Sequence, residues 1–451
     1  MNQTIQRRLY KLYSSSSRSS FGLRNRISSL GWIVVCGLPL CAFMASMYPR
    51  DTFFQLLGVV SAVCIAAFVS VLLRKAQLKV RRLLPRHASV GRPLEYTVEY
   101  TNLAKRGLNN FYMLDLAPDP TPSMDVFLHA TEPGEEKRNA FDRFFLAYRW
   151  NWLKSRFLLM KSKLFLANSV GGEKCGKVRV ELLPLRRGVI HLQNMRVVLP
   201  DALGLFQRVK RVDQEEDILI VLPKRYRMDS FDFAGQARSQ VGGDSSTSTQ
   251  GQSGEFVSLR EYRPGDPPKH IHWPSWGRTG KPILKEYEEM FFPRYGLVLD
   301  TAVRAEQEEV FEELVSVAAT LTSEMDTDQS LIDVMFIQQG AKVQTVGKNV
   351  ERVEAMLELL ASVEIDPVAD WAALKNAVLK HADDLTTCFL VFGDWDDERE
   401  NFLQSLSSFG ISLVVLVVQD EENPVKLNSD YTEITLLNVG EIEQGLASIH
   451  L

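Results

Sequence analysis

The sequence predicts a chain of three parts: a transmembrane hairpin of two helices, an all-β sandwich-like domain, and an α/β domain with a doubly wound sheet. Two uncharged apolar runs near the N-terminus indicate the hairpin. Apolar and polar residues then alternate with the period of two that is typical of strands. After Arg294, short apolar runs alternate with amphipathic stretches, as expected for strands followed by helices.

The two uncharged runs, residues 31–47 and 53–73, predict a transmembrane helical hairpin over residues 31–73. The hydrocarbon core of a bilayer is about 30 Å thick and needs roughly 20 helical residues. The second run therefore spans it comfortably and the first run narrowly. The residues between the runs suffice only for a tight turn, so the helices are expected to be antiparallel neighbours. A signal peptide is disfavoured, because no cleavage site and polar mature sequence follow the first run.

Lysine and arginine flank the hairpin at both of its outer ends. The basic N-terminal segment, residues 1–30, carries six of them and no acidic residue. Six more follow the second run: Arg74, Lys75, Lys79, Arg81, Arg82 and Arg86. The connecting turn holds one Arg beside one Asp. By the positive-inside rule, both termini are expected in the cytoplasm.

Residues 87–228 are predicted to form the β-sandwich-like domain. One row of apolar residues alternates with polar ones at Leu94, Tyr96, Val98 and Tyr100. Antiparallel strands with one apolar face must pack on a second sheet, which favours a sandwich. Residues 229–254 follow; they are rich in Gly, Ser and Thr, have almost nothing to bury, and predict a flexible linker.

A basic and aromatic insertion, residues 138–165, interrupts the strand pattern. Its aromatic residues recur at helical spacing at Phe141, Phe145, Tyr148 and Trp152, among seven Lys and Arg residues and one Asp. Such a mixture fits a helix that lies on an anionic membrane leaflet. An insertion packed on the sandwich explains the pattern equally well. Nucleic-acid binding is a third and weaker interpretation, because no recognised binding module accompanies the stretch.

The net charge of −4 conceals a basic part and an acidic part. Residues 295–451 contain 8 Lys and Arg against 30 Asp and Glu, whereas the first 294 residues contain 44 against 26. Anionic headgroups attract Lys and Arg, so this division suits a membrane-anchored chain. A merely soluble acidic domain explains the acidic part about as well. The five cysteines show no metal-type pair and no disulfide framework, as is typical of a reducing compartment.

Residues 255–290 hold the most distinctive run of side chains. It comprises Glu255, Phe256, Arg260, Glu261, Tyr262, Pro264, Gly265, Asp266, His270, His272, Trp273, Arg278, Glu286 and Tyr287. Arginines beside carboxylates form bidentate ion pairs and Pro-Gly-Asp favours a turn, so we interpret the run as a structural clasp with an exposed part for a partner. On a strand, the two histidines would share a face and offer two metal ligands. No nearby Cys or third His supports that hypothesis.

Residues 291–451 are predicted to form the α/β domain. Apolar runs at 295–299, 331–337, 387–392 and 411–418 indicate strands, and stretches at 310–321, 350–360, 370–380 and 401–409 indicate helices. This alternation predicts a parallel, doubly wound sheet. Any binding site is expected at the carboxyl ends of its strands.

The run at 255–290 resembles the signature of domain of unknown function family 58, whose members are membrane-anchored bacterial proteins with a von Willebrand factor A-like C-terminal domain. Two upstream segments resemble further parts of that family: Arg186-Arg187-Gly188 and Asp201-Ala202-Leu203-Gly204-Leu205-Phe206. The resemblance covers nearly the whole chain. It departs from the family at Pro274-Ser275-Trp276-Gly277, where a Lys-x-x-Ala run is commoner, and at the insertion.

The resemblance also points to a cation site that has degenerated. In a von Willebrand factor A domain, the first strand normally ends in Asp-x-Ser-x-Ser, whose oxygens bind a divalent cation. Here Asp300 is followed by Ala302 and Arg304 at the serine positions, and Asp394 falls where a second acid would lie. Alanine offers no ligand and arginine adds a positive charge. We therefore expect no metal there, and expect Asp300 and Asp394 to cap the following helices.

The resemblance further implies partnership with a MoxR-type AAA+ ATPase, in complex assembly or envelope maintenance at the bacterial inner membrane. We accordingly interpret the chain as a non-enzymatic, membrane-anchored adaptor without cofactor or evident small-molecule substrate, whose acidic domain is the docking surface. Two alternatives stay open: an envelope-assembly scaffold that acts without an ATPase, and a hydrolase that uses His270 and His272. The hydrolase is the weakest, because the sequence lacks a nucleophile elbow, a metal-ligand cluster and a phosphate loop.

Overall fold

The structure is a computed structural model whose contacts divide the chain into two units. It describes residues 3–24, 26–47, 51–228, 254–266, 268–289, 294–304, 307–325, 331–337, 341–346, 350–366, 371–420, 424–425 and 434–447. The first unit comprises residues 1–225, 305–307 and 357–364, and the second comprises 226–304, 308–356 and 365–451. The predicted flexible linker, residues 229–254, lies outside the described residues except for Gly254, where a strand begins.

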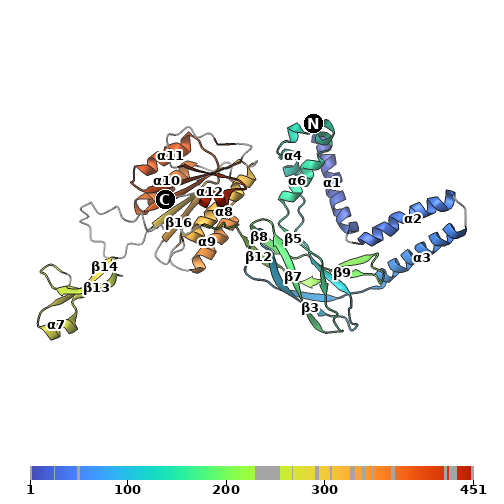
Figure 1. Ribbon diagram of the computed structural model, residues 1–451, viewed down its shortest axis with the longest axis horizontal. Coiled ribbons are helices and arrows are strands. Elements are labelled where there is room, and N and C mark those ends of the chain that lie inside the picture. The colour runs from blue at the N-terminus through green and yellow to red at the C-terminus, as the bar shows by residue number, and fades with distance from the viewer. Residues whose placement is uncertain are drawn as a thin grey trace. The chain divides into compact units, whose positions relative to one another are not determined.

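Three helices begin the first unit: α1 (Gln3–Arg24), α2 (Ser29–Met47) and α3 (Asp51–Leu73). Two of them, α2 and the Thr52–Leu73 stretch of α3, are long and apolar enough to cross a membrane. They contact each other and are drawn in blue in Figure 1. Large apolar side chains of both helices, such as Ile33 and Ile65, are exposed. The predicted hairpin is therefore confirmed as a pair of apolar helices.

The β part of the first unit consists of three sheets. Their strand orders are β11-β1-β3-β7-β5, β10-β9-β4-β6 and β2-β12-β8. The strands are β1 (Leu78–Leu83), β2 (His87–Ser89), β3 (Leu94–Asn102), β4 (Phe111–Asp115), β5 (Met160–Ser162), β6 (Phe165–Ala167), β7 (Cys175–Pro184), β8 (Gly188–Leu192), β9 (Met195–Pro200), β10 (Gln207–Arg211), β11 (Asp213–Gln214) and β12 (Asp217–Leu222). Neighbours are antiparallel except in the pairs β1–β11 and β2–β12.

One apolar core is shared by the three sheets. The alternation predicted for β3 is confirmed, because Tyr96, Val98 and Tyr100 are buried and the residues between them are not. The strands begin at Leu78, upstream of the expected start at residue 87, and they form three sheets where a simple sandwich has two. Pro184, which has no N–H to donate, is the last residue of β7, and the chain continues as β8 in another sheet.

The basic aromatic insertion contains short helices as well as two strands. The helices within it are α5 (Ala140–Phe145) and α6 (Ala147–Arg156), and the short helices α4 (Met124–His129) and η1 (Glu135–Lys137) directly precede it. Leu146 separates α5 from α6 with a left-handed φ of 54°, so the predicted aromatic row does not follow a single helix. Phe127, Leu146, Trp150 and Leu153 form a small core with Leu9, Tyr10 and Tyr13 of α1. The helices thus pack on α1, whereas the end of the insertion joins the sheets as β5 and β6.

The second unit contains a six-stranded sheet in the order β17-β16-β15-β18-β19-β20. Its strands are β15 (Arg294–Leu299), β16 (Leu331–Ile337), β17 (Ala341–Val346), β18 (Thr387–Phe392), β19 (Ser412–Gln419) and β20 (Ile434–Asn438). Its helices are α8 (Glu308–Glu324), α10 (Trp371–His381), α11 (Asp397–Ser407), α12 (Ile442–Ala447) and the first part of α9 (Val350–Ser362), whose residues from Leu357 belong to the first unit. A parallel sheet was predicted, and this is wrong for one strand, since β17 is antiparallel to β16. Only three residues join these two strands, too few for a parallel crossover.

Helices of this α/β part bury the sheet and fix the end of its first strand. Leu374 and Val378 of α10 and Phe402 of α11 pack in one core with residues of β15, β18 and β19. Helix α8 contacts the same three strands and buries Leu314. β15 lies between β16 and β18, where the strand order reverses, and the crevice at such a reversal is the usual ligand site of open α/β sheets. Asp300 follows β15 at that edge.

Candidate functional site

The signature run forms an antiparallel hairpin with a short helix between its strands. β13 (Gly254–Glu261) pairs with β14 (Ile283–Glu289), and the turn η3 (Pro268–His270) and helix α7 (Trp273–Thr279) lie between them. Along the backbone, Phe256 pairs with Tyr287 and Glu255 pairs with Glu288, while Glu286 pairs with Ser258 beyond a bulge. The side chains of Glu255, Phe256, Glu286 and Tyr287 lie outside the described residues.

Arg260 and Asp266 form a bidentate ion pair in this hairpin. Arg260 Nη1 lies 2.7 Å from Oδ2 of Asp266, and Nη2 lies 3.0 Å from Oδ1. The backbone N–H of Arg263 donates to the same carboxylate at 2.9 Å, closing a turn in which Gly265 has a φ of 110°. The hydrogen bond from Arg260, with that from Arg263, lowers the pKa of Asp266 below its ordinary value. The two side chains remain 33% and 18% exposed, so the clasp lies at the surface.

The remaining charged residues of the signature are arranged more loosely. Glu261 and Lys281 approach to 3.2 Å, and both are exposed. Arg278 is exposed on α7, and no ion pair joins it to an acidic residue within the described part of the hairpin. Tyr262 donates its backbone N–H to Pro282 at 3.0 Å. Of the signature arginines whose side chains are described, Arg260 is the one that forms the predicted carboxylate pair.

The two signature histidines do not share a face of a strand. His270 ends η3, which begins at Pro268, and His272 directly precedes α7. Nδ1 of His272 lies 2.7 Å from Oγ of Ser275, one turn along the helix. The strand geometry behind the metal hypothesis is therefore wrong. Proline favours the start of a helical turn, which the expectation of a strand overlooked.

Two tryptophans of the signature lie on α7. The rings of Trp273 and Trp276 stack with their centroids 5.2 Å apart, and Trp273 is 64% exposed. Pro274 stands in the first turn of α7, so the four residues that depart from the family pattern form this helix. Tryptophan is enriched where one protein binds another, which makes the tip of the hairpin a candidate docking surface.

The edge of the six-stranded sheet holds a buried ion pair at the end of β15. Nε and Nη2 of Arg399, on α11, lie 2.9 and 2.7 Å from Oδ2 of Asp300. Oδ1 accepts the backbone N–H of Ala302 at 2.9 Å. Burial raises the pKa of the Asp300 carboxyl, and the charge and hydrogen bonds of Arg399 oppose that shift. The guanidinium also lies over the ring of Trp371, 5.0 Å from its centroid. A cationic side chain of the chain itself thus satisfies this carboxylate.

This arrangement corrects one sequence-based expectation, that of helix caps at Asp300 and Asp394. Arg304 is 3.7 Å from Asp394, and its side chain is 75% exposed. Asp300 is paired with Arg399 and lies eight residues before α8 begins at Glu308, and Asp396 rather than Asp394 caps α11 by accepting the N–H of Arg399. Sequence reasoning missed Arg399 altogether. The available signal was one arginine in an otherwise acidic first turn directly after a strand.

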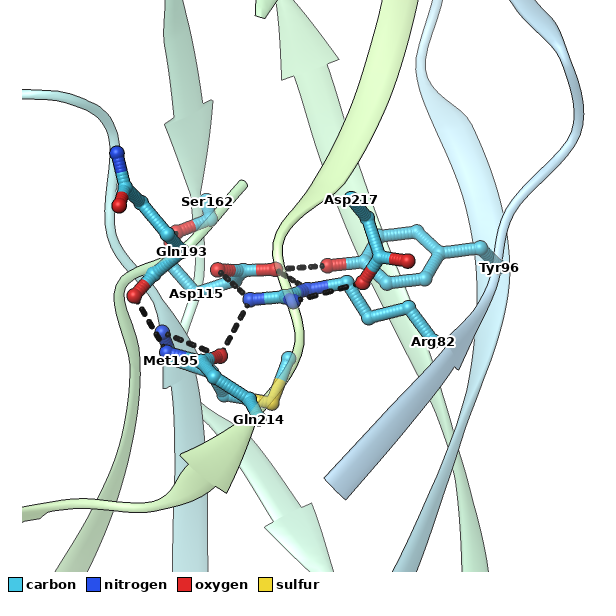
Figure 2. A network of polar contacts seen from close by, with 8 residues as sticks. All are labelled: Arg82, Tyr96, Asp115, Ser162, Gln193, Met195, Gln214 and Asp217. Atoms are coloured by element: carbon cyan, nitrogen blue, oxygen red, sulfur yellow. Dashed lines mark hydrogen bonds and ion pairs between the residues drawn. The ribbon is translucent and has the colours of Figure 1, made fainter. Parts of the chain in front are cut away.

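A second buried ion pair joins the three sheets of the β part (Figure 2). Arg82 of β1 donates to Asp115 of β4 through Nε at 2.7 Å and through Nη2 at 3.0 Å. It also donates to Asp217 of β12 at 3.0 Å and to Gln214 of β11 at 2.8 Å. The hydroxyl of Tyr96 donates to Asp115 at 2.8 Å, as Figure 2 shows. One guanidinium therefore links strands of all three sheets.

The two central side chains of this network are almost completely buried. The side chains of Arg82 and Asp115 are 1% and 0% exposed. Burial alone would lower the pKa of the Arg82 guanidinium, but its hydrogen bond and charge interaction with Asp115 raise it above the ordinary value. Burial and Asp115 likewise raise the pKa of Tyr96. Arg82, one of the six cations counted after the second apolar run, takes the third inward position of β1 after Leu78 and Val80.

The segment 201–206 is a tight turn that docks on the start of α2. Asp201 donates its N–H to Phe206 O at 2.9 Å, and Gly204 has a φ of 72°. Leu205 O accepts the N–H of Ser28 at 3.0 Å. A Cβ at Gly31 would collide with that same carbonyl oxygen, so the close approach requires glycine.

Two arginines fasten the other end of the hairpin to the β part. Nη1 of Arg208, from β10, donates to the carbonyl oxygens of Leu72 and Arg74 at 2.6 and 3.0 Å. The last carbonyls of a helix have no partner within it, so Arg208 caps α3. Arg74 in turn donates to Pro200 O at 2.5 Å and to Asn109 O at 3.0 Å. Both ends of the apolar hairpin are thus hydrogen-bonded to the sheets.

Comparison with known proteins gives limited information. No family model matches the chain. The uncharacterized protein YeaD of Bacillus subtilis (strain 168) is 29% identical over 170 residues, which are 37% of this chain and only 38% of YeaD. Two structures of the CARDB domain of the PF1109 protein from Pyrococcus furiosus, one of them in complex with di-metal ions, are each 9% identical. They cover 33% and 32% of this chain and 92% of the domain, with TM-scores of 0.16 and 0.14. TM-scores this low do not indicate a shared fold.

Proposed function

We propose that this chain is a non-enzymatic, membrane-anchored adaptor whose cytoplasmic parts bind a protein partner. The hairpin of α2 and α3 is its anchor, and the partner is an AAA+ ATPase of the MoxR type. The proposed location is a bacterial inner membrane, with both termini in the cytoplasm because Lys and Arg flank the outer ends of the hairpin.

The observation that carries the proposal is the double attachment of the β part to the hairpin. The turn at 201–206 meets the start of α2, and Arg208 caps the end of α3. A domain joined by a loose linker would need neither contact. An adaptor that must hold a partner at a fixed distance from a bilayer needs both.

Partner binding is supported by two features of the chain after residue 253. The segment 295–451 has 30 acidic against 8 basic residues, a surplus that attracts a basic partner surface. The signature hairpin presents the stacked Trp273 and Trp276. At the sheet edge, Asp300 is already paired with Arg399, which favours a structural role for that carboxylate over a catalytic one.

The family and fold assignments belong to the same proposal. The six-stranded sheet has the order 3-2-1-4-5-6 when its strands are counted along the chain, and its third strand is antiparallel. That order supports a doubly wound domain similar to von Willebrand factor A. The signature residues support membership of domain of unknown function family 58.

The proposal is tested by affinity purification of the tagged full-length chain from membranes of its source cells. We expect an AAA+ ATPase among the enriched proteins, and binding of the purified ATPase to the chain in nanodiscs. Trp273→Ala should weaken that binding while Leu166→Ala, an exposed control on β6, should not. Recovery of envelope proteins without any ATPase would favour the scaffold, and failure of the purified ATPase to bind would overturn the proposal.

Topology provides a separate test of the anchor. Alkaline-phosphatase fusions after Arg86 and at the C-terminus should be inactive, because that enzyme works only outside the cytoplasm. A fusion in the turn between α2 and α3 should be active. Activity at either of the first two positions would contradict the proposed orientation.

A further inference from the structure

The helices of the insertion carry an exposed aromatic patch: Phe141, Phe144 and Phe145 of α5 and Tyr148 of α6. Phe141 is 70% exposed and Phe144 is 49% exposed. The rings form one surface, because the centroid of Phe145 lies 4.6 Å from that of Phe141 and 5.3 Å from that of Phe144. A contiguous apolar patch of this kind is characteristic of an interaction site.

The exposed rings of the patch are not residues of an incompletely packed core. The insertion already buries Trp150 and Leu153 against Tyr10 and Tyr13 of α1. Helix α5 begins with a hydrogen-bonded cap, since Asn139 accepts the N–H of Asp142, and the preceding α4 is capped by Ser123, which accepts the N–H of Val126. The exposed rings therefore belong to a well-defined surface that remains after the inner face has packed.

Helix α1 holds this surface close to the start of the apolar hairpin. Tyr13 donates its hydroxyl to Phe145 O at 2.8 Å, and Nζ of Lys154 donates to Oγ of Ser17 at 2.7 Å. Ser17 precedes the end of α1 by seven residues, and five more lead to Ser29, where α2 begins. At 1.5 Å per helical residue and at most about 3.5 Å per extended one, the distance from Ser17 to Ser29 is under about 30 Å.

Charge around the patch selects an anionic surface. Arg143 is exposed between the phenylalanines, and α1 contributes the exposed cations Arg7, Arg8 and Lys11 without an acidic residue. The guanidinium of Arg138 lies over the ring of Tyr148, 3.9 Å from its centroid, and is also paired with Glu132 at 2.8 Å. Exposed aromatic side chains accompanied by cations are typical of segments that bind the interface of an anionic bilayer.

We propose that the aromatic patch inserts into the headgroup region of the anionic bilayer that the hairpin crosses. This inference rests on the proposed membrane anchoring and extends it to a second, peripheral contact. Phe141, Phe144 and Phe145 enter the boundary between headgroups and acyl chains. Arg143 and the cations of α1 face the lipid phosphates.

Photo-crosslinking of the full-length chain in proteoliposomes tests the contact. The photoreactive analogue benzoylphenylalanine replaces, one at a time, Phe144 in the patch, Ile65 in α3, or Ile218 as an exposed control on β12. In vesicles of phosphatidylglycerol and phosphatidylcholine, the analogue at 144 should form lipid adducts several-fold above the level at 218. That excess should fall in pure phosphatidylcholine and at high salt, since screening weakens headgroup attraction.

The position in α3 separates the two hypotheses. Adducts at 65 with only the control level at 144 would overturn the peripheral contact and leave the anchor intact. An absence of lipid adducts at 65 would overturn the anchor and this inference together. Protein adducts at 144 in native membranes, without lipid adducts, would make the patch a protein-binding surface and refute the lipid contact. Phe141→Ser with Phe145→Ser should lower adduct formation at 144 several-fold.

Discussion

Two arginine–aspartate pairs of this chain share one geometry and differ in burial. Arg82 with Asp115 and Arg260 with Asp266 are both bidentate, with the closer contact at 2.7 Å in each. The first pair is almost fully removed from solvent, whereas the second is partly exposed. The first also holds Gln214 and Asp217, while the second adds one backbone N–H.

Bidentate geometry alone therefore says little about what a pair contributes to stability. Removing one partner of a buried pair leaves an uncompensated charge in a medium of low polarity, whereas water replaces the lost partner at the surface. The Arg82 network is structural by this criterion. The signature pair orders a local turn at the surface.

The largest effect is expected from Arg82→Ala, which strands Asp115 between the sheets. The free energy of unfolding should fall by about 3–5 kcal/mol, a large part of the roughly 5–15 kcal/mol typical of a domain. Thermal unfolding of the full-length chain in nanodiscs measures the loss. Arg81→Ala is the matched control, since the neighbouring side chain is exposed and should change stability by less than about 0.5 kcal/mol. Equal melting of both variants would show that burial does not distinguish these pairs.

Arg399→Ala sharpens the comparison at the sheet edge. It leaves Asp300 buried without its cation, so a loss of about 3–5 kcal/mol is again expected. The double variant Arg399→Ala with Asp300→Asn should lose less than the single variant, because the stranded charge is gone. Denaturant unfolding of the four members of this cycle measures the coupling. A double variant as unstable as the sum of the two singles would mean that the ion pair has no coupling energy.

Gly31→Ala tests the attachment of the hairpin. The added methyl group collides with Leu205 O, and such overpacking costs about 1–3 kcal/mol. The amides of Ser28 and Gln207, which are hydrogen-bonded across the junction, should exchange with deuterium about tenfold faster or more. Gly37→Ala is the control in the same helix, where a methyl group meets nothing within 4 Å. Unchanged exchange in Gly31→Ala would show that the junction is loose.

The smallest effect is expected from Arg260→Ala. Its melting temperature should fall by less than that of Arg82→Ala, while Lys269→Ala, an exposed control, should melt like the wild type. The pKa of Asp266 is lowered in the folded chain, so its contribution is present above the ordinary pKa of the carboxyl and is lost as the pH falls through the folded value. The melting difference between wild type and Arg260→Ala should therefore vanish in strong acid. A difference that persists there would remove the ion pair as its cause.

Local periodicity predicted most of the elements. The apolar runs became α2 and α3, the alternation at Tyr96 became β3, and the four strands and four helices expected after residue 294 lie within a few residues of those observed. Each of these patterns reflects burial along one segment. The antiparallel β17 was missed because the length of a connection, rather than periodicity, decides strand direction there.

The polar sites could be predicted only in part. The Arg260–Asp266 pair was accessible because the two residues are only six positions apart in the chain. Arg399 meets Asp300 across 99 residues and Arg82 meets Asp217 across 135, so neither pairing follows from local spacing. Arg82 shows what such a prediction would need: a charged residue at an inward position of a strand demands a buried partner.

In the proposed membrane-anchored state, the hairpin and the β part should move together, because both ends of the hairpin are hydrogen-bonded to the sheets. Helix α2 has 19 residues and α3 has 23, lengths of about 28 and 34 Å. Helices tilt when their apolar length differs from the thickness of the bilayer. Because Arg208 and the turn at Leu205 join the sheets to both helices, any such tilt rotates the β part as well. The thickness of the bilayer thereby sets the angle between the β part and the plane of the membrane.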